Sequence, residues 1–194
     1  MRANDLKKIK KLYFSTDDIA TALTISKASA RVTASRYTRS DFITRIKRDV
    51  YILTNRIPFL SEEEQFQLAN LIETPSYISL TSALAYYNLT TQQPRQFVES
   101  IALKRKKHVL VGEIEFSYTL IKESMYNGFE LNNQFFIARP EKALADCIYL
   151  TSLKRYNCDF HGVDFHKIDC QKVRSFLINA NKAALNLWEA LCKN

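Results

Sequence analysis

The hydrophobic positions of the first sixty residues change from a helical period to an alternating one. Apolar residues recur at helical spacing in 4–14 and 15–23, which predicts two short helices. A very short turn leads to a third predicted helix over 26–39. The segment 42–53 then alternates, is rich in β-branched and aromatic residues, and has a turn at 47–49. Three helices followed by a hairpin is the element order of a winged helix-turn-helix.

The third predicted helix carries four basic residues and no acid. Ser26 is a good N-cap, and Ala30, Thr33 or Ala34, and Tyr37 can form the buried stripe, with the phase left open. Long cations between small neighbours let a helix backbone approach phosphates and enter a major groove. The predicted DNA-binding residues of this helix are Lys27, Ser29, Arg31, Ser35, Arg36 and Arg39.

The hairpin supplies the remaining predicted contacts. In a winged helix its tip lies against phosphate or the minor groove, and Arg45, Lys47 and Arg48 stand there. Two turn positions lack the expected Gly: Thr24 occupies the turn between the second and third helices, and Asp49 must provide positive φ in the hairpin. A protein-binding winged helix and a lipid-facing basic helix are the alternatives. The lipid alternative lacks a large apolar face opposite the lysines.

The remaining chain has a mixed pattern, which predicts an α+β protein with domains 1–58 and 59–194. Ser61 and Glu64 form a capping box that starts a helix. We expect helices on a small sheet. The expected strands lie at 77–78, 97–104, 108–121, 127–131 and 134–138, and the later helices at 79–87, 140–153, 173–177 and 183–191.

The net charge of +8 is confined to one part of the chain. Residues 1–60 hold 13 Lys/Arg against 5 Asp/Glu, whereas residues 61–194 hold 15 of each. This asymmetry predicts a basic module joined to a neutral one, and a basic module can meet nucleic acid, anionic lipid or an acidic protein. The neutral part has one basic cluster, Lys104 to Lys107. We favour a solvated turn there over a secondary phosphate contact.

Several classes of protein are disfavoured. No apolar run approaches the roughly 18 residues of a membrane span, and the N-terminal segment lacks the apolar region of a signal peptide. The four Cys have no CxxC spacing, so a reduced cytoplasm fits best and neither a zinc finger nor a disulfide framework is expected. There is no Gly-rich phosphate loop, HExxH or nucleophile elbow, so we predict neither an enzyme nor a cofactor.

Two groups of polar residues have types that could carry chemistry. Cys158, Asp159, His161, Asp164 and His166 could bind a transition metal, but their spacing fits no standard site, and we predict no metal. The second is a lone carboxylate, Asp146, inside an apolar helix. We expect it to be exposed or capped rather than catalytic.

The whole chain resembles the AbiEi-like antitoxins of bacterial type IV toxin–antitoxin, or abortive-infection, systems. The resemblance is carried by ISKASARVTASRYTRSDFITRIKRDVYIL, TPSYISLTSALAYYNL and FFIARPEKALADCIYL, in the family's order. It implies a winged helix that binds inverted repeats in double-stranded DNA near its own promoter and represses the operon. It also implies a C-terminal domain that counteracts a co-encoded nucleotidyltransferase-like toxin, without requiring a stable complex.

Two other functions remain open at the level of sequence. A stand-alone regulator could sense a ligand with its second domain. A nucleic-acid-processing enzyme could use the basic module for substrate capture, in which case a metal-dependent activity should map to Asp164 or His166.

Overall fold

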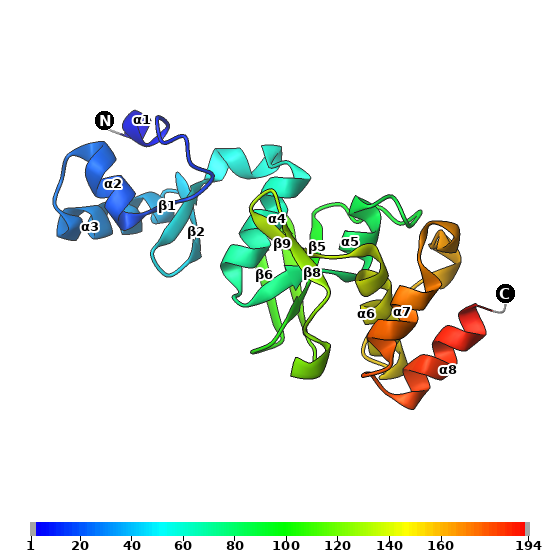
Figure 1. Cartoon of the computed structure of the whole chain (residues 1–194). Helices are drawn as coiled ribbons and strands as arrows, with labels where there is room; N and C mark the ends of the chain where they lie inside the picture. The colour runs from blue at the N-terminus through cyan, green and yellow to red at the C-terminus, as the bar shows by residue number, and fades with distance from the viewer. Residues whose placement is uncertain (1–2, 193–194) are drawn as a thin grey trace. The chain divides into compact units, whose positions relative to one another are not determined.

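The protein divides into two compact units in a computed structural model that describes residues 3–192 (Figure 1). The N-terminal unit comprises the chain up to Glu64 together with Leu110–Glu113. The C-terminal unit comprises Gln65–Val109 and the chain from Ile114 onward. Among the described residues no helix is long and apolar enough to cross a membrane.

The N-terminal unit combines short helices with a three-stranded antiparallel sheet of order β1-β3-β2. Its elements are α1 (Ala3–Leu6), β1 (Phe14–Ser15), α2 (Thr16–Leu23), α3 (Lys27–Arg39), β2 (Ile43–Lys47), β3 (Val50–Leu53) and the 3-10 helix η1 (Thr54–Phe59).

The capping box at the start of α2 confirms the predicted helix boundary. The Ser15 N–H donates to Asp18 Oδ2 at 2.8 Å, and the Asp18 N–H donates to Ser15 Oγ at 3.2 Å. Burial alone raises the pKa of Asp18. The Lys11 ammonium, 2.6 Å from Oδ1, and the Ser15 donors more than offset this and hold that pKa below its ordinary value. The cap therefore keeps its charge into mildly acidic solution.

The prediction of a helix over 4–14 was wrong beyond its first turn. α1 ends at Leu6, and Phe14 instead pairs with Tyr51 in the sheet and is buried. Four lysines within 7–11 would crowd one another on a continued helix, because like charges at i, i+4 spacing are destabilising. Burial of Phe14 in the sheet adds stability that a continued helix would not provide.

The core of the N-terminal unit fixes which face of α3 points inward. Ala30, Ala34 and Tyr37 are buried against Ile19 and Leu23 of α2, whereas Thr33 of α3 is only half-buried. Of Thr33 and Ala34, it is therefore Ala34 that belongs to the buried stripe of α3. Alanines at this contact let α2 and α3 pack closely with their charged faces in water.

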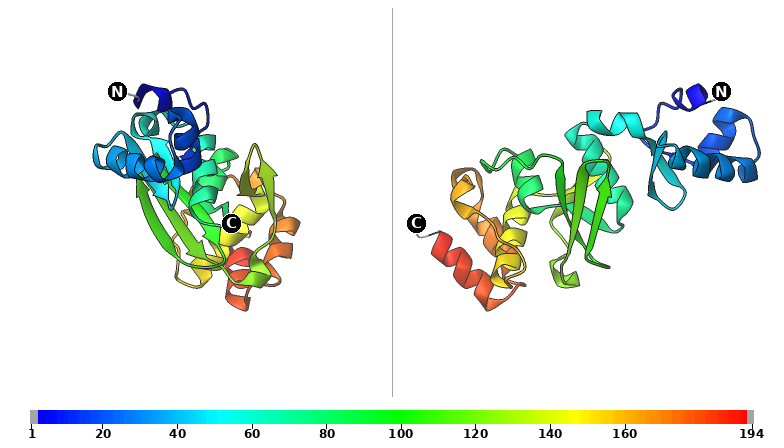
Figure 2. Two further views of the ribbon diagram at one scale, coloured as in Figure 1. Left: turned by 90° about the vertical axis from the view of Figure 1, so that its left-hand side faces the viewer. Right: turned by 180° about the vertical axis from the view of Figure 1, so that it is seen from behind.

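The C-terminal unit consists of a mixed sheet with helices on both faces (Figure 2). The six strands follow the order β6-β7-β5-β4-β9-β8, with β5–β7 and β4–β9 parallel, and β4–β5 and β8–β9 antiparallel. The strands are β4 (Ser76–Ile78), β5 (Phe97–Ala102), β6 (Lys107–Val111), β7 (Ile114–Leu120), β8 (Phe129–Asn132) and β9 (Phe135–Ala138). The helices from Glu62 onward are α4 (Glu62–Ile72), α5 (Leu80–Tyr86), η2 (Glu123–Met125), α6 (Pro140–Ser152), η3 (Phe160–Gly162), η4 (Phe165–Lys167), α7 (Cys170–Leu177) and α8 (Lys182–Leu191).

Side chains on the two faces of this sheet contact different helices. On one face the Tyr118 hydroxyl of β7 donates to the Ala69 carbonyl of α4 at 2.7 Å. On the other face Tyr77 of β4 reaches Asp146 of α6, and Glu99 of β5 reaches the start of α5. Strand β5 is therefore buried on both sides, which explains its almost continuous burial.

Most of the predicted elements of this unit are confirmed. Ser61 and Glu64 form the expected reciprocal hydrogen bonds at 3.1 and 3.2 Å, and Pro140 occupies the first turn of α6. Trp188 is buried where α8 packs beside α6 and α7. The four Cys are free thiols. The fold is α+β, as predicted, with a larger sheet than the sequence suggested.

Candidate nucleic-acid interface

Helix α3 presents an acid-free polar face that begins at a well-formed cap. Ser26 Oγ accepts from the Ser29 N–H at 3.2 Å, and the preceding turn places Thr24 at φ 54°, in the left-handed region. The turn thus adopts the conformation for which Gly was expected, with Thr in its place. The polar face of α3 carries six of the predicted residues, and all of them are exposed: Lys27, Ser29, Arg31, Ser35, Arg36 and Arg39.

The hairpin is formed by β2 and β3, and its tip is tied to the start of α2. Asp49 lies in the tip at φ 61°, and its carboxylate accepts from both the N–H and the hydroxyl of Thr16. The register shifts between Arg45 and Lys47, and the Arg45 Nε donates to the Lys47 carbonyl at 3.3 Å. Arg45 and Arg48 are exposed, and Lys47 is half-buried. A bulge of this kind re-aims side chains next to it.

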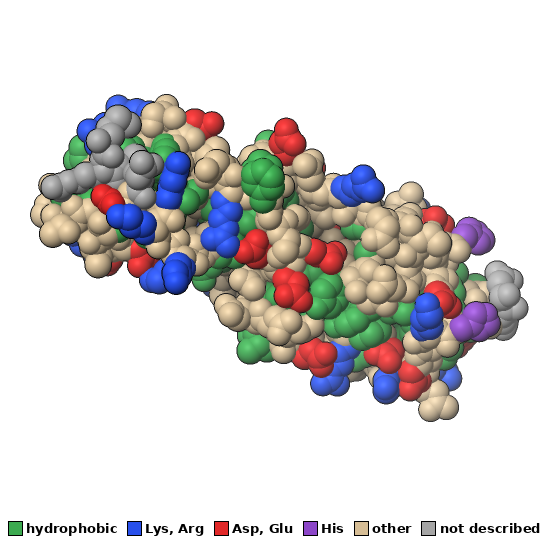
Figure 3. All heavy atoms as spheres, turned by 90° about the horizontal axis from the view of Figure 1, so that it is seen from above, with side chains coloured by type: hydrophobic (Ala, Val, Ile, Leu, Met, Phe, Trp, Pro, Cys, Tyr) green, Lys and Arg blue, Asp and Glu red, His purple; other side chains and the backbone are tan. Residues whose placement is uncertain are grey.

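The cations of the N-terminal unit differ in how much they are neutralised. Lys27 pairs with Asp17 at 2.8 Å, and the Arg36 guanidinium lies 5.3 Å from the centre of the Tyr37 ring. Within residues 3–192, neither Arg31 nor Arg48 has an acidic partner. Figure 3 shows several Lys and Arg side chains at the surface of this unit. Charges without partners are available for an anionic ligand.

One exposed residue of α3 was missed by the prediction. Val32 is 71% exposed, on the side of the helix that also carries Arg36, four residues later. The buried stripe of Ala30, Ala34 and Tyr37 leaves position 32 on the opposite side of the helix, and this spacing was the signal that could have identified Val32. Its methyl groups are of the kind that contact thymine methyl groups in a major groove.

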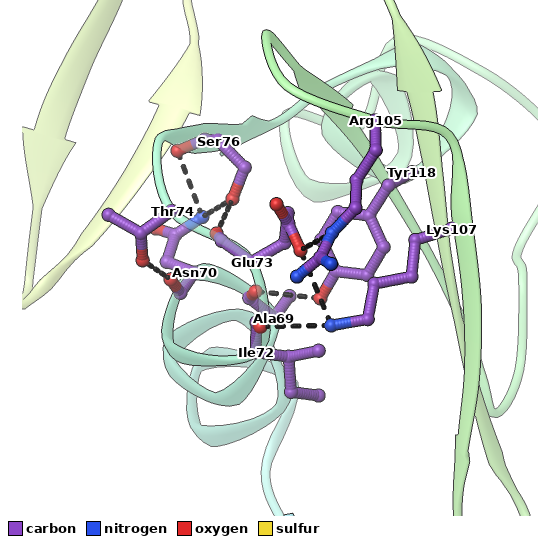
Figure 4. Close-up of polar contacts among 9 residues, drawn as sticks. All are labelled: Ala69, Asn70, Ile72, Glu73, Thr74, Ser76, Arg105, Lys107 and Tyr118. Carbon is purple, nitrogen blue, oxygen red and sulfur yellow. Dashed lines mark hydrogen bonds and ion pairs between the residues drawn. The ribbon is translucent and has the colours of Figure 1, made fainter. Parts of the chain in front are cut away.

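The basic cluster Lys104 to Lys107 has a structural role that neither sequence alternative described. Arg105 and Lys107 both donate to the buried carboxylate of Glu73, at 3.0 and 3.3 Å (Figure 4). Lys107 also donates to the Ile72 carbonyl at the end of α4, at 3.2 Å. Only Lys104 and Lys106 fit the expected solvated turn. Two of the four cations are thus already used within the protein.

The residues considered for a metal do not converge. Asp159 accepts from the His161 N–H, and Asp164 accepts from the His166 N–H, so each acid caps a 3-10 turn. The described residues contain no group of three His, Cys, Asp or Glu side chains that could hold a metal ion. The repeated Asp-Phe-His pattern is explained by turn geometry.

Asp146 is neither exposed nor a helix cap, contrary to our expectation. It is fully buried in α6, forms an ion pair with the equally buried Lys142, and accepts from Tyr77 and Ser79 at 3.0 and 2.8 Å. Burial raises the pKa of Asp146, and the Lys142 ammonium acts against this rise. The i, i+4 spacing of the two charges within an apolar helix was the signal that could have revealed the pair.

Comparison with known proteins supports the fold and goes no further. A scan against models of protein families finds no match, and neither does a search of curated proteins. The structure is similar to the crystal structure of the Rv2827c protein from Mycobacterium tuberculosis, with a TM-score of 0.66 and 11% identity. The similarity covers 98% of this chain and 74% of that chain. At this identity the similarity is one of fold alone.

Proposed function

We propose that this protein is a DNA-binding transcriptional autorepressor that acts as the antitoxin of a type IV toxin–antitoxin system. In this proposal, residues up to about 58 form a winged helix-turn-helix, with α3 as the recognition helix and the β2–β3 hairpin as the wing. The observation that carries the DNA-binding part of this proposal is the acid-free, exposed polar face of α3, whose orientation is set by the buried stripe on its other side.

In this proposal, different residues contact the phosphates and the bases of the DNA. Exposed cations without acidic partners, such as Arg31 and Arg48, can contact phosphates and supply most of the affinity. Small polar residues of α3 and the exposed Val32 can approach base edges and supply sequence preference. The fixed hairpin tip places its cations at a constant position relative to α2.

A salt titration with the DNA upstream of the protein's own gene tests DNA binding. If about six phosphates are contacted, the slope of log affinity against log salt should lie near roughly −5. Random DNA of equal length should bind more weakly. A flat salt response, or equal affinity for both DNAs, would contradict a specific repressor.

A pair of charge-matched double variants tests which surface binds. Arg31→Ala with Arg36→Ala should lower affinity for the upstream DNA by roughly 1.5 to 4 orders of magnitude, since each strong contact is worth about 1–3 kcal/mol. Lys104→Ala with Lys106→Ala removes the same charge from the C-terminal unit and should leave affinity nearly unchanged. Equal losses in both variants would show that net charge, and not α3, determines binding.

The antitoxin role rests on the sequence resemblance and is tested separately. Co-expression of the full chain should relieve growth inhibition by a neighbouring nucleotidyltransferase-like toxin. Because the resemblance implies that the C-terminal domain carries this effect, the Arg31→Ala, Arg36→Ala protein should still relieve toxicity when expressed from an unrelated promoter. Failure of the wild-type chain to protect cells would reject the antitoxin role and leave DNA binding untouched.

A further inference from the structure

A cavity of about 490 Å³ opens in the C-terminal unit where β5 meets the start of α5 and the segment after α6. Its volume lies within the range of small-molecule sites. Phe97 and Pro94 supply an apolar part of the lining, and Gln92, Gln93 and Asn157 supply side-chain amides. Among the described residues that line it, Glu99 is the only charged one.

Glu99 is buried and its position is fixed by the backbone. Only 6% of the residue is exposed. Its N–H donates to Ser82 Oγ at 2.9 Å, and its carbonyl accepts from the Ser79 N–H at 3.1 Å. These bonds hold the side chain against the start of α5, at the wall of the cavity.

Neutral groups supply the hydrogen bonds to the carboxylate of Glu99. The Thr81 N–H donates to Oε2 at 3.1 Å, and the Tyr156 hydroxyl donates to the same oxygen at 3.0 Å. Tyr156 is itself held by Thr81 Oγ1 at 2.7 Å. The Ser82 N–H and the Thr81 side chain also contribute hydrogen bonds to this carboxylate. All of these groups are neutral, so they hold the carboxylate in place without balancing its charge.

Glu99 differs from the other buried acids of the described chain in having no cation. Glu73 pairs with Arg105 and Lys107, and Asp146 pairs with Lys142. No Lys, Arg or His within residues 3–192 forms an ion pair with Glu99. A buried carboxylate is costly unless it is paired. Of these three acids, Glu99 is the one that lines this cavity.

We propose that this cavity binds a small organic cation, whose ammonium or amidinium group pairs with Glu99 and whose apolar part lies against Phe97 and Pro94. The amide oxygens of Gln92, Gln93 and Asn157 can accept the remaining N–H groups. Anionic ligands are disfavoured, because no cation is among the described lining residues. All of the described lining residues belong to the C-terminal unit, so a ligand bound here would act on that unit.

The protonation of Glu99 makes the binding depend on pH. Burial raises the pKa of Glu99 to about 7, although hydrogen bonds from Tyr156 and Thr81 oppose the rise. A cation requires the ionised carboxylate. Its affinity should therefore be constant well above pH 7 and fall about tenfold for each pH unit well below it.

Calorimetric titration of the full-length protein with benzamidine and benzamide tests the site. The two probes share a planar phenyl group, and only benzamidine carries a positive charge. At pH 8 benzamidine should bind at least tenfold more tightly than benzamide. Glu99→Gln, which keeps an acceptor for Thr81 and Tyr156, should remove this preference. Glu123→Gln, at an exposed glutamate away from the cavity, should retain it.

Three results would overturn the proposal. These are the absence of benzamidine binding at millimolar concentration and pH 8, equal affinity for the two probes, and unchanged benzamidine affinity in folded Glu99→Gln. Circular dichroism verifies that the variant is folded. If the variant does not fold, the wild type is titrated with both probes at pH 8 and at pH 5. A preference for benzamidine that is lost at pH 5 supports pairing with Glu99. A preference that is the same at both pH values rejects the proposal.

Discussion

The two units of the protein use charged residues in opposite ways. In the N-terminal unit the cations of α3 stand in water, and Arg31 and Arg48 have no acidic partner among the described residues. In the C-terminal unit the Lys142–Asp146 pair is completely buried. The first arrangement keeps charge available to a partner outside the protein, whereas the second uses charge to specify the interior.

This difference has an energetic consequence. Exposed ion pairs contribute about 0–1 kcal/mol, because water and salt screen them. Loss of one member of a buried pair leaves an uncompensated charge and costs about 3–5 kcal/mol. Substitutions of the same chemical kind should therefore affect binding in one unit and folding in the other.

The largest effect is expected at the buried pair. Lys142→Met leaves Asp146 without its cation and should lower the free energy of unfolding by about 3–5 kcal/mol. Adding Asp146→Asn removes the stranded charge yet keeps an acceptor for Tyr77 and Ser79, so much of the loss should be recovered. Urea unfolding followed by far-ultraviolet circular dichroism measures both variants.

A matched substitution gives the contrast. Lys167→Met removes a lysine from the exposed pair with Asp164 and should leave the unfolding midpoint unchanged. Additive losses in the Lys142, Asp146 double variant would contradict a coupled buried pair.

A smaller effect is expected from the pH dependence of Glu99. Its pKa of about 7 in the folded protein lies above the ordinary value of 4.5, so the folded state holds the proton more tightly. The stabilisation is complete below pH 4.5 and is lost as the pH rises through 7. Between pH 4.5 and 7.5 the wild type should lose on the order of 2–3 kcal/mol more than Glu99→Gln. Urea midpoints across this range measure it, and parallel curves for the two proteins would refute it.

Helix capping in the N-terminal unit should have a moderate effect. Ser15→Ala removes the hydroxyl that accepts from the Asp18 N–H and should cost about 1 kcal/mol. Thermal unfolding measures the loss. Asp18→Asn should lose less, because an amide oxygen can still accept from the Ser15 N–H. The opposite ranking would indicate that the charge of Asp18, and not the cap, stabilises α2.

The smallest effect on stability is expected at the exposed arginines. Arg31→Ala should change the free energy of unfolding by less than about 0.5 kcal/mol. Arg105→Ala removes the same type of side chain from an ion pair with the buried Glu73. It should lower the free energy of unfolding by more than Arg31→Ala does, although Lys107 still pairs with Glu73. Similar stability losses at both positions would remove the distinction between the two units.

Local signals in the sequence were sufficient for much of the N-terminal unit. The caps at Ser15 and Ser26, the β-branched and aromatic residues of the hairpin, and the positive φ of Asp49 all depend on neighbours close in sequence. The predicted alternation is not followed in β2, where Ile43 and Ile46 are both buried and a register shift follows Arg45. The place of Phe14 in the sheet could not be predicted, because its partner Tyr51 lies far along the chain.

The sites of the C-terminal unit depend on partners distant in sequence. Glu73 meets Arg105 32 residues later, and Tyr156 reaches Glu99 across 57 residues. Residue type alone does not say whether such an acid is solvated, paired or left facing a cavity. The role of the 104–107 cluster and the burial of Asp146 therefore became clear only from the structure.

The bond between Asp49 and Thr16 has a thermodynamic consequence for recognition. A free hairpin would have to lose conformational entropy when a ligand orders it, and that loss would weaken binding. Here the tip is already anchored to the first residue of α2 by two hydrogen bonds. The hairpin is thus preorganised. Its conformational entropy is lost when the protein folds, so a ligand that contacts Arg48 does not have to order the hairpin on binding.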